Sequence, residues 1–140
     1  MVELSGKLDS KVAIITGGSG GIGRAAATLF AAEGARIILV DLDDHALQDA
    51  VAEIGSDRVE AVVADVTDTT QTQAYIAAAA EHFGGVNIAL LNAGIEGTVK
   101  PISEYDEDMF DKVIAVNVRG VFLGLKYIMP AINARGGGSI

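Results

Sequence analysis

The feature that most constrains this chain is an apolar strand that runs directly into a glycine-rich turn and then into a helix. The strand candidate is Lys11–Thr16, residues 17–23 read Gly-Gly-Ser-Gly-Gly-Ile-Gly, and helical spacing of apolar residues begins at about Gly21. The first N–H groups of a helix lack intrahelical partners, and the helix dipole adds positive charge there. The turn therefore predicts a pyrophosphate site, with a tight strand–helix turn that binds nothing as the alternative.

The rest of the sequence alternates apolar strands with helical segments, which predicts an α/β fold. Further strands are expected at Arg36–Asp41, Arg58–Ala64 and Asn87–Leu91, and Ser139-Ile140 is expected to begin a fifth. Helices are expected at Gly21–Glu33, from Asp43 or Asp44 to Ile54, and at Asp68–Phe83, Glu104–Arg119 and Gly120–Arg135. Right-handed crossovers then give a Rossmann-type, doubly wound parallel sheet in the order 3-2-1-4-5. Residues 1–140 are expected to form one dinucleotide-binding domain, cut short at the start of strand five.

Composition excludes several kinds of site. The net charge of −9 argues against nucleic acid or an anionic membrane as a partner, although solubility alone explains such a charge. The chain has no cysteine, so thiolate chemistry and disulfides are excluded, and His45 and His82 lack the spacing of metal ligands. No metal is expected.

The same composition bears on cellular location. The first ten residues are too polar for a signal peptide, and no apolar run is expected to reach the length of a membrane span. We therefore expect a cytoplasmic protein.

Asp41 lies at the end of the second expected strand, eighteen residues after Gly23. A carboxylate in this place accepts hydrogen bonds from the adenosine ribose and repels a 2′-phosphate. No Arg or Lys lies within Gly17–Ile22 or at Leu42 to bind that phosphate. The pattern predicts NAD as the cofactor in preference to NADP. A helix-capping role for Asp41 is the alternative, but Asp43 and Asp44 already supply caps.

The turn Thr16-Gly17-x-x-x-Gly21-Ile22-Gly23 resembles the T-G-x-x-x-G-x-G cofactor turn of the short-chain dehydrogenase/reductase family. Leu91-Asn92-Ala93-Gly94 is similar to the family's Asn-Asn-Ala-Gly, with Leu91 in place of the first Asn. Asn117-Val-Arg-Gly120 resembles the family's Asn-x-x-Gly. The resemblance extends from Lys11 to Ile140 and covers the cofactor half of a usual member.

The resemblance implies a set of cofactor-binding residues. They are Gly17, Ser19, Gly20, Gly21, Ile22, Gly23, Asp41, Leu42, Asp65, Val66, Asn92, Ala93 and Gly94. In the family the residue at Asp65 hydrogen-bonds the adenine amino group, although a capping or turn role is the alternative here. Small residues after strand four let the backbone lie against the cofactor ribose, and Asn92 can brace the neighbouring strand ends.

Asn117 shares a helical stripe with Phe110, Val113, Ile114 and Val121, so we expect a buried amide that faces the core. Buried amides need hydrogen-bond partners. The residues alone leave two roles open: an Asn that pins helix to sheet, or one that holds a water on a proton relay. The resemblance favours the relay and makes Asn117 the candidate catalytic residue.

The remaining catalytic residues of the family, a Ser and a Tyr-x-x-x-Lys pair, are not found in this chain. Tyr75, Tyr105 and Tyr127 are followed four positions later by Ala79, Met109 and Ala131, and Ser139 comes too early in strand five. We expect the 140 residues alone to be inactive and the missing residues to follow Ile140.

The resemblance implies an oxidoreductase that transfers a hydride between NAD and an alcohol or ketone. A dinucleotide-binding module without catalysis, such as a redox sensor, is the alternative. The helix Gly120–Arg135 carries more apolar surface than one side of a sheet covers. Members of the family commonly pair this helix between subunits. The apolar surface and the resemblance together predict a homo-oligomer, a tetramer in the complete protein.

Overall fold

The computed structural model describes residues 6–140 and contains a four-stranded, fully parallel sheet. The strands are β1 (Val12–Thr16), β2 (Arg36–Asp41), β3 (Val59–Val63) and β4 (Ile88–Leu91), in the order β3-β2-β1-β4. Ile14 of β1 lies opposite Ile38 of β2 and Ala89 of β4. The expected α/β, Rossmann-type parallel sheet is confirmed.

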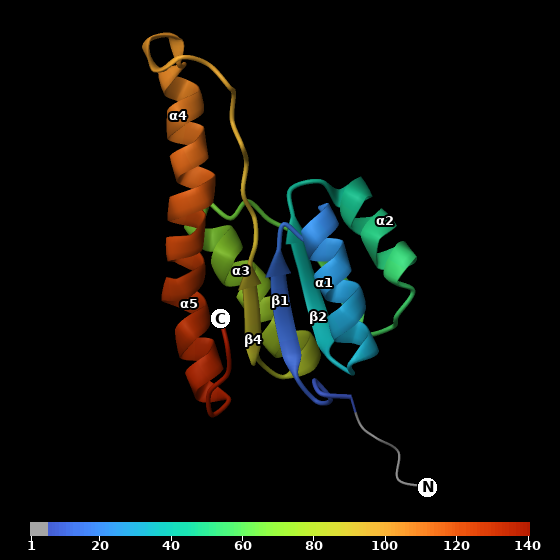
Figure 1. The fold of residues 1–140 in the computed structure, drawn as a ribbon. Helices are drawn as coiled ribbons and strands as arrows, with labels where there is room; N and C mark the ends of the chain where they lie inside the picture. Colours follow the sequence, from blue (N-terminus) through green and yellow to red (C-terminus); the bar gives the residue numbers. More distant parts are fainter. Residues whose placement is uncertain (1–5) are drawn as a thin grey trace, which may run out of the picture.

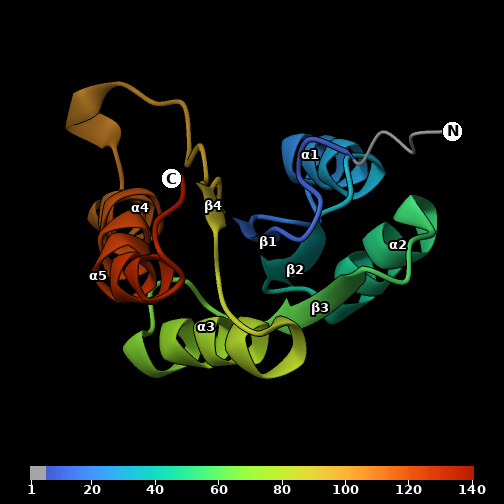
Figure 2. The ribbon, with the colours of Figure 1, turned by 90° about the horizontal axis from the view of Figure 1, so that it is seen from below.

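Helices cover both faces of this sheet (Figures 1 and 2). One face carries α1 and α2, and the other carries α3 and α5. The helices are α1 (Gly21–Ala32), α2 (Asp44–Ile54), α3 (Thr69–Phe83), α4 (Glu107–Ile114) and α5 (Gly120–Ala134), with a 3₁₀ turn η1 (Ile102–Glu104) and a π-helical turn η2 (Ala115–Arg119). The crossovers place the carboxyl ends of all four strands at one edge.

Alternate residues of the central strands divide the core into two halves. Val12 and Ile14 of β1 face α3 and α5, whereas Ala13 and Ile15 face α1 and α2. Side chains of a strand alternate between the two faces of its sheet, and both faces here are covered. This explains why β1 is apolar at every position, as parallel strands buried on both sides are.

The second and third helices are capped at both ends, close to their expected bounds. Asp43 caps α2 by accepting a hydrogen bond from the Ala46 amide, and Asp68 caps α3 through the Gln71 amide. Gly55 and Gly84 end these two helices in the left-handed conformation that glycine adopts readily. The second and third helices are thus confirmed to within a residue or two.

The helical region after β4 differs from the expectation. α4 begins at Glu107 rather than at Glu104, because Tyr105 is extended and the Asp106 carboxylate caps the Asp108 amide. α4, η2 and α5 then form one continuous helix, Glu107–Ala134, instead of two separate ones. The π-helical turn within it contains Asn117, and such turns occur frequently at functional sites.

The length of this helix corrects a second expectation. By length and composition alone, Glu107–Ala134 is able to cross a bilayer, so the statement that no apolar segment reaches that length is wrong. A core helix of a water-soluble protein meets the same criteria, and α5 buries Leu123, Ile128 and Ile132. The absence of a membrane partner stays a prediction. The signal-peptide expectation falls partly on residues 1–5, outside the described residues.

Ser139 pairs with β4 in the parallel direction expected of a fifth strand. Ser139 forms a bridge with Ile88, its amide donates to the Asn87 carbonyl at 3.0 Å, and its carbonyl accepts from the Ala89 amide at 3.0 Å. This single bridge agrees with the expected place of a fifth strand beside β4, although the described sheet contains four strands.

Candidate functional site

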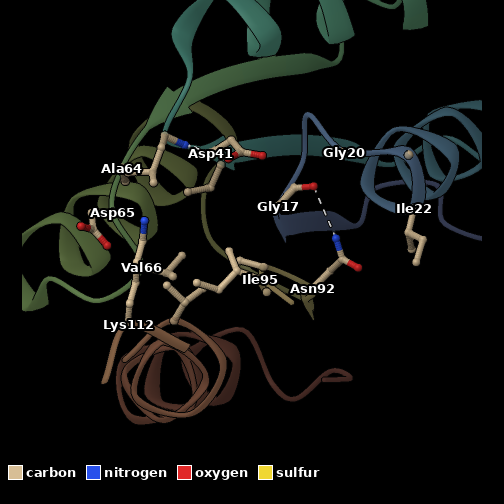
Figure 3. Close-up of a pocket in the computed structure, with 16 residues that line it drawn as sticks. Gly17, Gly20, Ile22, Asp41, Ala64, Asp65, Val66, Asn92, Ile95 and Lys112 are labelled. Carbon is tan, nitrogen blue, oxygen red and sulfur yellow. Dashed lines mark hydrogen bonds between the residues drawn. The ribbon is translucent and has the colours of Figure 1, made fainter. Parts of the chain in front are cut away.

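A cavity of about 440 Å³ opens where the carboxyl ends of the strands converge (Figure 3). It lies where the chain leaves β1 for one face of the sheet and β4 for the other, which is where open α/β sheets bind ligands. Eleven of the residues predicted to bind the cofactor line it: Gly17, Gly20, Gly21, Ile22, Asp41, Leu42, Asp65, Val66, Asn92, Ala93 and Gly94. The structure therefore brings together segments far apart in sequence.

The glycine turn brings the backbone after β1 close to the start of α1. Gly17 has φ +65°, which side-chain-bearing residues rarely adopt. A Cβ on Gly23 would lie 2.3 Å from the Gly17 carbonyl oxygen, so this glycine allows α1 to approach the turn closely. A Cβ on Gly21, by contrast, would meet no atom within 4 Å. Gly21 borders open space at the start of α1, where unpaired N–H groups favour an anion.

Asp41 lies on the cavity wall at the end of β2, and its carboxylate is held from two sides. Oδ2 accepts hydrogen bonds from Ser19 Oγ at 2.6 Å and from the Ser19 amide at 3.2 Å. Oδ1 accepts one from the Leu42 amide at 2.8 Å. Ser19 does not line the cavity and acts on it through Asp41. A carboxylate oxygen has about two acceptor sites, so Oδ1 retains capacity for a hydroxyl donor, whereas Oδ2 already accepts two hydrogen bonds.

Asp65 follows β3, where it makes a local turn and also lines the cavity. Its Oδ1 accepts from the Thr67 amide at 2.8 Å and from the Thr67 hydroxyl at 2.7 Å, which is a local turn. Among residues 6–140 no hydrogen bond is made to its Oδ2. The residue also lines the cavity next to Val66, so one oxygen supports the turn while the other remains open to a ligand.

Asn92 braces the ends of β1 and β4, as expected. Its side-chain Nδ2 donates to the Thr16 carbonyl at 3.2 Å and contacts the Gly17 carbonyl at 3.4 Å. The Ala93 amide donates to Thr16 Oγ1 at 3.1 Å. Leu91, which replaces the family's first Asn, packs against Gly124 of α5. A Cβ on Gly124 would lie 2.9 Å from the Leu91 side chain. The Leu91 side chain thus serves helix packing.

Asn117 corrects the expectation of a buried amide. The residue is exposed, as are Phe110 and Ile114 of the same stripe, because α4 and the turn η2 that follows it extend past the edge of the sheet (Figure 1). Its partners lie in the loop after β4: Oδ1 accepts from the Ile95 amide at 2.8 Å, and Nδ2 donates to the Ile95 carbonyl at 2.9 Å. Asn117 therefore fixes the backbone of a cavity-lining residue.

Five cavity-lining residues were not predicted from the sequence. They are Val40, Ala64, Ile95, Lys112 and Val116. Val40, Ala64 and Ile95 are direct neighbours of predicted residues, so widening each motif by one position would have found them. Lys112 and Val116 come from α4 and η2, and nothing in the sequence indicates that they reach the sheet edge. Lys112 extends from α4 toward the end of β3, near Asp65 (Figure 3).

The two histidines lie outside this cavity, each beside a carboxylate. His82 contacts Glu60, and His45 pairs with Asp49 at 3.3 Å one helical turn later. Within residues 6–140 no group of three or more His, Asp or Glu side chains is placed to hold a metal ion.

Comparison with known proteins shows one family across the sequence. The family described as short chain dehydrogenase matches residues 11–140. Levodione reductase from Leifsonia aquatica is 41% identical over 138 residues, 96% of this chain and 52% of that protein. The 2-(R)-hydroxypropyl-CoM dehydrogenase of Xanthobacter autotrophicus is 40% identical, over 94% of this chain and 54% of its own length. The chain spans about half the length of the curated relatives it matches.

Solved structures agree with this match. The crystal structure of levodione reductase superposes with a TM-score of 0.90 at 40% identity, covering 94% of this chain and 53% of that one. The NAD⁺-bound xylitol dehydrogenase structure gives a TM-score of 0.89 at 32% identity, covering 94% of this chain and 52% of the other. Both carry the fold described above.

Proposed function

Because this chain belongs to the short-chain dehydrogenase family, we propose that it is the NAD-binding half of an oxidoreductase acting on an alcohol or ketone. One observation carries the choice of NAD: the Asp41 carboxylate lies on the cavity wall, held there by Ser19 and Leu42. A 2′-phosphate would meet this negative charge, whereas ribose hydroxyls would donate to it. The similarity to an NAD⁺-bound xylitol dehydrogenase supports the same cofactor.

The residues around the cavity fit the parts of a dinucleotide in order. Asp65 and Val66 would hold the adenine, Asp41 the adenosine ribose, and the amides after Gly20 the pyrophosphate. The backbone of Asn92–Gly94 would lie along the second ribose. When bound, the nicotinamide supplies the hydride acceptor or donor. The described residues supply the binding and orientation.

Asn117 is proposed to act by positioning. Its side chain forms two hydrogen bonds with the Ile95 backbone. These bonds fix the distance between the loop after β4 and the π-helical turn η2. Proton transfer to the substrate oxygen is assigned, from the family resemblance, to a Ser, a Tyr and a Lys of the full-length protein. In this proposal the Asn117 side chain keeps the cavity wall in register with those groups and with the water of their relay.

Assembly as a homo-oligomer, with a tetramer expected, is part of this proposal. An exposed apolar stripe runs along the continuous helix; it consists of Phe110, Ile114, Val118, Phe122, Leu125 and Met129. These residues recur at intervals of three and four, so they share one helix face. Contiguous apolar surface of this kind marks interaction sites, and a closed two-fold contact would cover it.

Titration of the purified full-length protein with NADH and NADPH, followed by nucleotide fluorescence, tests the cofactor assignment. We expect NADH to bind at least tenfold more tightly. Turnover with a panel of secondary alcohols and ketones then tests the reaction. Binding of NADH without any turnover would support a redox sensor in place of an enzyme, and equal affinity for both nucleotides would exclude the Asp41 argument.

A further inference from the structure

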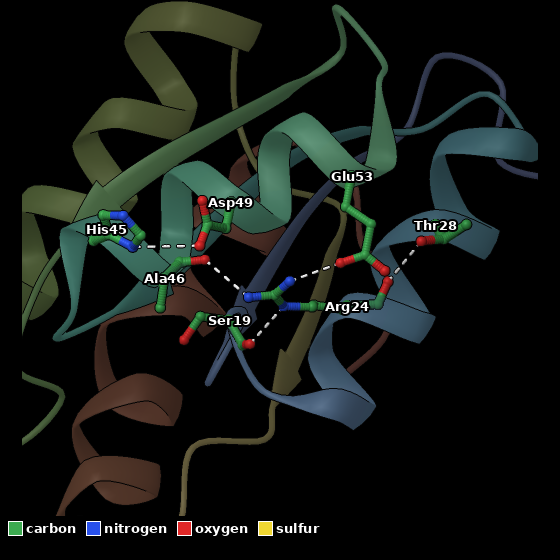
Figure 4. Close-up of polar contacts among 7 residues, drawn as sticks. All are labelled: Ser19, Arg24, Thr28, His45, Ala46, Asp49 and Glu53. Carbon is green, nitrogen blue, oxygen red and sulfur yellow. Dashed lines mark hydrogen bonds and ion pairs between the residues drawn. The ribbon is translucent and has the colours of Figure 1, made fainter.

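Arg24 lies in the first turns of α1, outside the cavity, and connects three segments of the chain (Figure 4). Its Nε donates to the Ser19 carbonyl at 2.7 Å, and its Nη2 donates to the Ala46 carbonyl at 3.2 Å. Its Nη1 forms an ion pair with Glu53 at 2.7 Å. The planar guanidinium thus uses all three of its nitrogens at once, which a lysine ammonium on one carbon stem does not reproduce.

Two of these contacts connect Arg24 to the surroundings of Asp41, each through a different residue. The first runs through Ser19, whose carbonyl receives Arg24 while its amide and hydroxyl hold Asp41 Oδ2. The second runs through Ala46, in the first turn of α2, whose amide is capped by Asp43. Asp43 is two residues beyond Asp41. Arg24 therefore ties together the two segments that flank this carboxylate.

The segment that Arg24 holds is rich in glycine. Ser19 is surrounded by Gly17, Gly18 and Gly20, and glycine loses more backbone freedom on ordering than other residues. A charge-assisted hydrogen bond to the Ser19 carbonyl is stronger than a neutral one and restricts this freedom before a ligand arrives. The Glu53 pair is more exposed, at 66% for the Glu53 side chain, and such pairs contribute little to stability.

We propose that Arg24 is a positioning residue for nucleotide discrimination: by holding Ser19 and the start of α2, it presets Asp41 to accept ribose hydroxyls and to reject a 2′-phosphate. This inference rests on the proposed function, because it takes Asp41 to be the residue that discriminates. Arg24 does not line the cavity, and each of its three nitrogens already donates to a carbonyl or to Glu53.

The test is a double-mutant cycle in the full-length protein, with the ratio of the NADPH and NADH dissociation constants as the readout. We expect Arg24→Met to lower this ratio about tenfold, mainly through weaker NADH binding. Glu53→Gln is the matched control; it keeps both carbonyl contacts and is expected to change the ratio less than about twofold. In an Asp41→Ala background, Arg24→Met should leave the ratio unchanged.

The outcomes separate the two claims. If Asp41→Ala leaves the ratio at its wild-type value, the proposed NAD preference fails. If Asp41→Ala abolishes discrimination but Arg24→Met weakens both nucleotides equally, Arg24 is merely structural and the inference is overturned. Should Arg24→Met not fold, as judged by circular dichroism, Arg24→Lys and Ser19→Ala replace it, and both must lower the ratio for the inference to stand.

Discussion

Ser19 Oγ donates to Asp41 Oδ2 at 2.6 Å, which joins the glycine turn after β1 to the end of β2. The two residues are 22 positions apart in sequence, and the contact orients a carboxylate on the cavity wall. A hydroxyl–carboxylate hydrogen bond of this length belongs to the stronger class of protein hydrogen bonds. At Oδ2 the Ser19 hydroxyl would compete with a hydroxyl of a bound ribose.

Reversal of nucleotide preference is the first prediction. Asp41→Ala combined with Leu42→Arg removes the repelling carboxylate and adds a cation for a 2′-phosphate. The ratio of the NADPH and NADH dissociation constants should therefore fall by about two orders of magnitude, in favour of NADPH. Fluorescence titration of both nucleotides measures this. Leu42→Arg alone serves as the control and should shift the ratio much less, because Asp41 remains.

Two glycines of the same turn should respond differently to alanine. Gly23→Ala places a Cβ 2.3 Å from the Gly17 carbonyl oxygen, so α1 must move; we expect a loss of about 2 kcal/mol in unfolding free energy together with weakened NADH binding. Gly21→Ala meets no protein atom within 4 Å and should leave stability unchanged while weakening NADH binding. Urea unfolding and NADH titration distinguish these cases. Tight NADH binding by Gly21→Ala would contradict the proposal that the start of α1 binds the pyrophosphate.

Asn117 should affect turnover more than cofactor affinity. In the full-length enzyme, Asn117→Ala frees the Ile95 backbone, and we expect kcat to fall at least tenfold while the NADH dissociation constant changes less than threefold. Asn117→Asp keeps the acceptor for the Ile95 amide and loses the donor to its carbonyl, so it should retain more activity. Full turnover by the alanine variant would leave Asn117 a structural residue.

Tyr75 offers a test of the core that leaves the site untouched. Its side chain is fully buried between α3 and the sheet, and among residues 6–140 its hydroxyl has no partner at hydrogen-bond geometry. Burial raises the pKa of Tyr75, and the neighbouring Thr72 hydroxyl, which donates to the Asp68 carbonyl, offsets this only in part. Tyr75→Phe removes the unpaired hydroxyl and should raise the unfolding free energy by about 1 kcal/mol. Tyr75→Ala should lower it by about 3–5 kcal/mol, measured by urea unfolding.

The apolar stripe predicts the assembly state. Phe122→Glu and Met129→Glu place charges in the middle of the stripe and should convert the expected tetramer into smaller species in light scattering. Val99→Glu, at an exposed residue of the loop after β4 that is not part of the stripe, is the control and should leave the assembly intact. A monodisperse monomer of the unmodified full-length protein would contradict the prediction.

Local chemistry made most of the fold readable from the sequence. Apolar runs located the strands, and the second and third helices lie within a residue or two of their expected bounds, because the caps that end a helix act within a few residues. Asp41 and Asn92 were located as well, since parallel strands bring their carboxyl ends to one edge whatever the helices do.

Tertiary packing decided which face of each helix is covered. Spacing alone put Asn117 in a buried stripe, yet α4 extends beyond the sheet and the residue is exposed. In α1 the buried positions are Gly23 and Ala27, whereas Ile22 is 72% exposed and lines the cavity. Small residues set that close approach, which a pattern of large apolar residues does not reveal.

Long-range polar contacts were beyond the sequence for a related reason. Arg24 reaches Ser19, Ala46 and Glu53, and Lys112 reaches the cavity, only after the crossovers have placed their helices beside the strand ends. From its neighbours in sequence alone, a charged side chain on a helix is expected to face solvent. The sequence by itself therefore determined the strands, the glycine turn and the place of the Asp41 carboxylate at the end of β2. The structure decided what holds that carboxylate in place, because hydrogen bonds between distant segments depend on how the helices dock on the sheet.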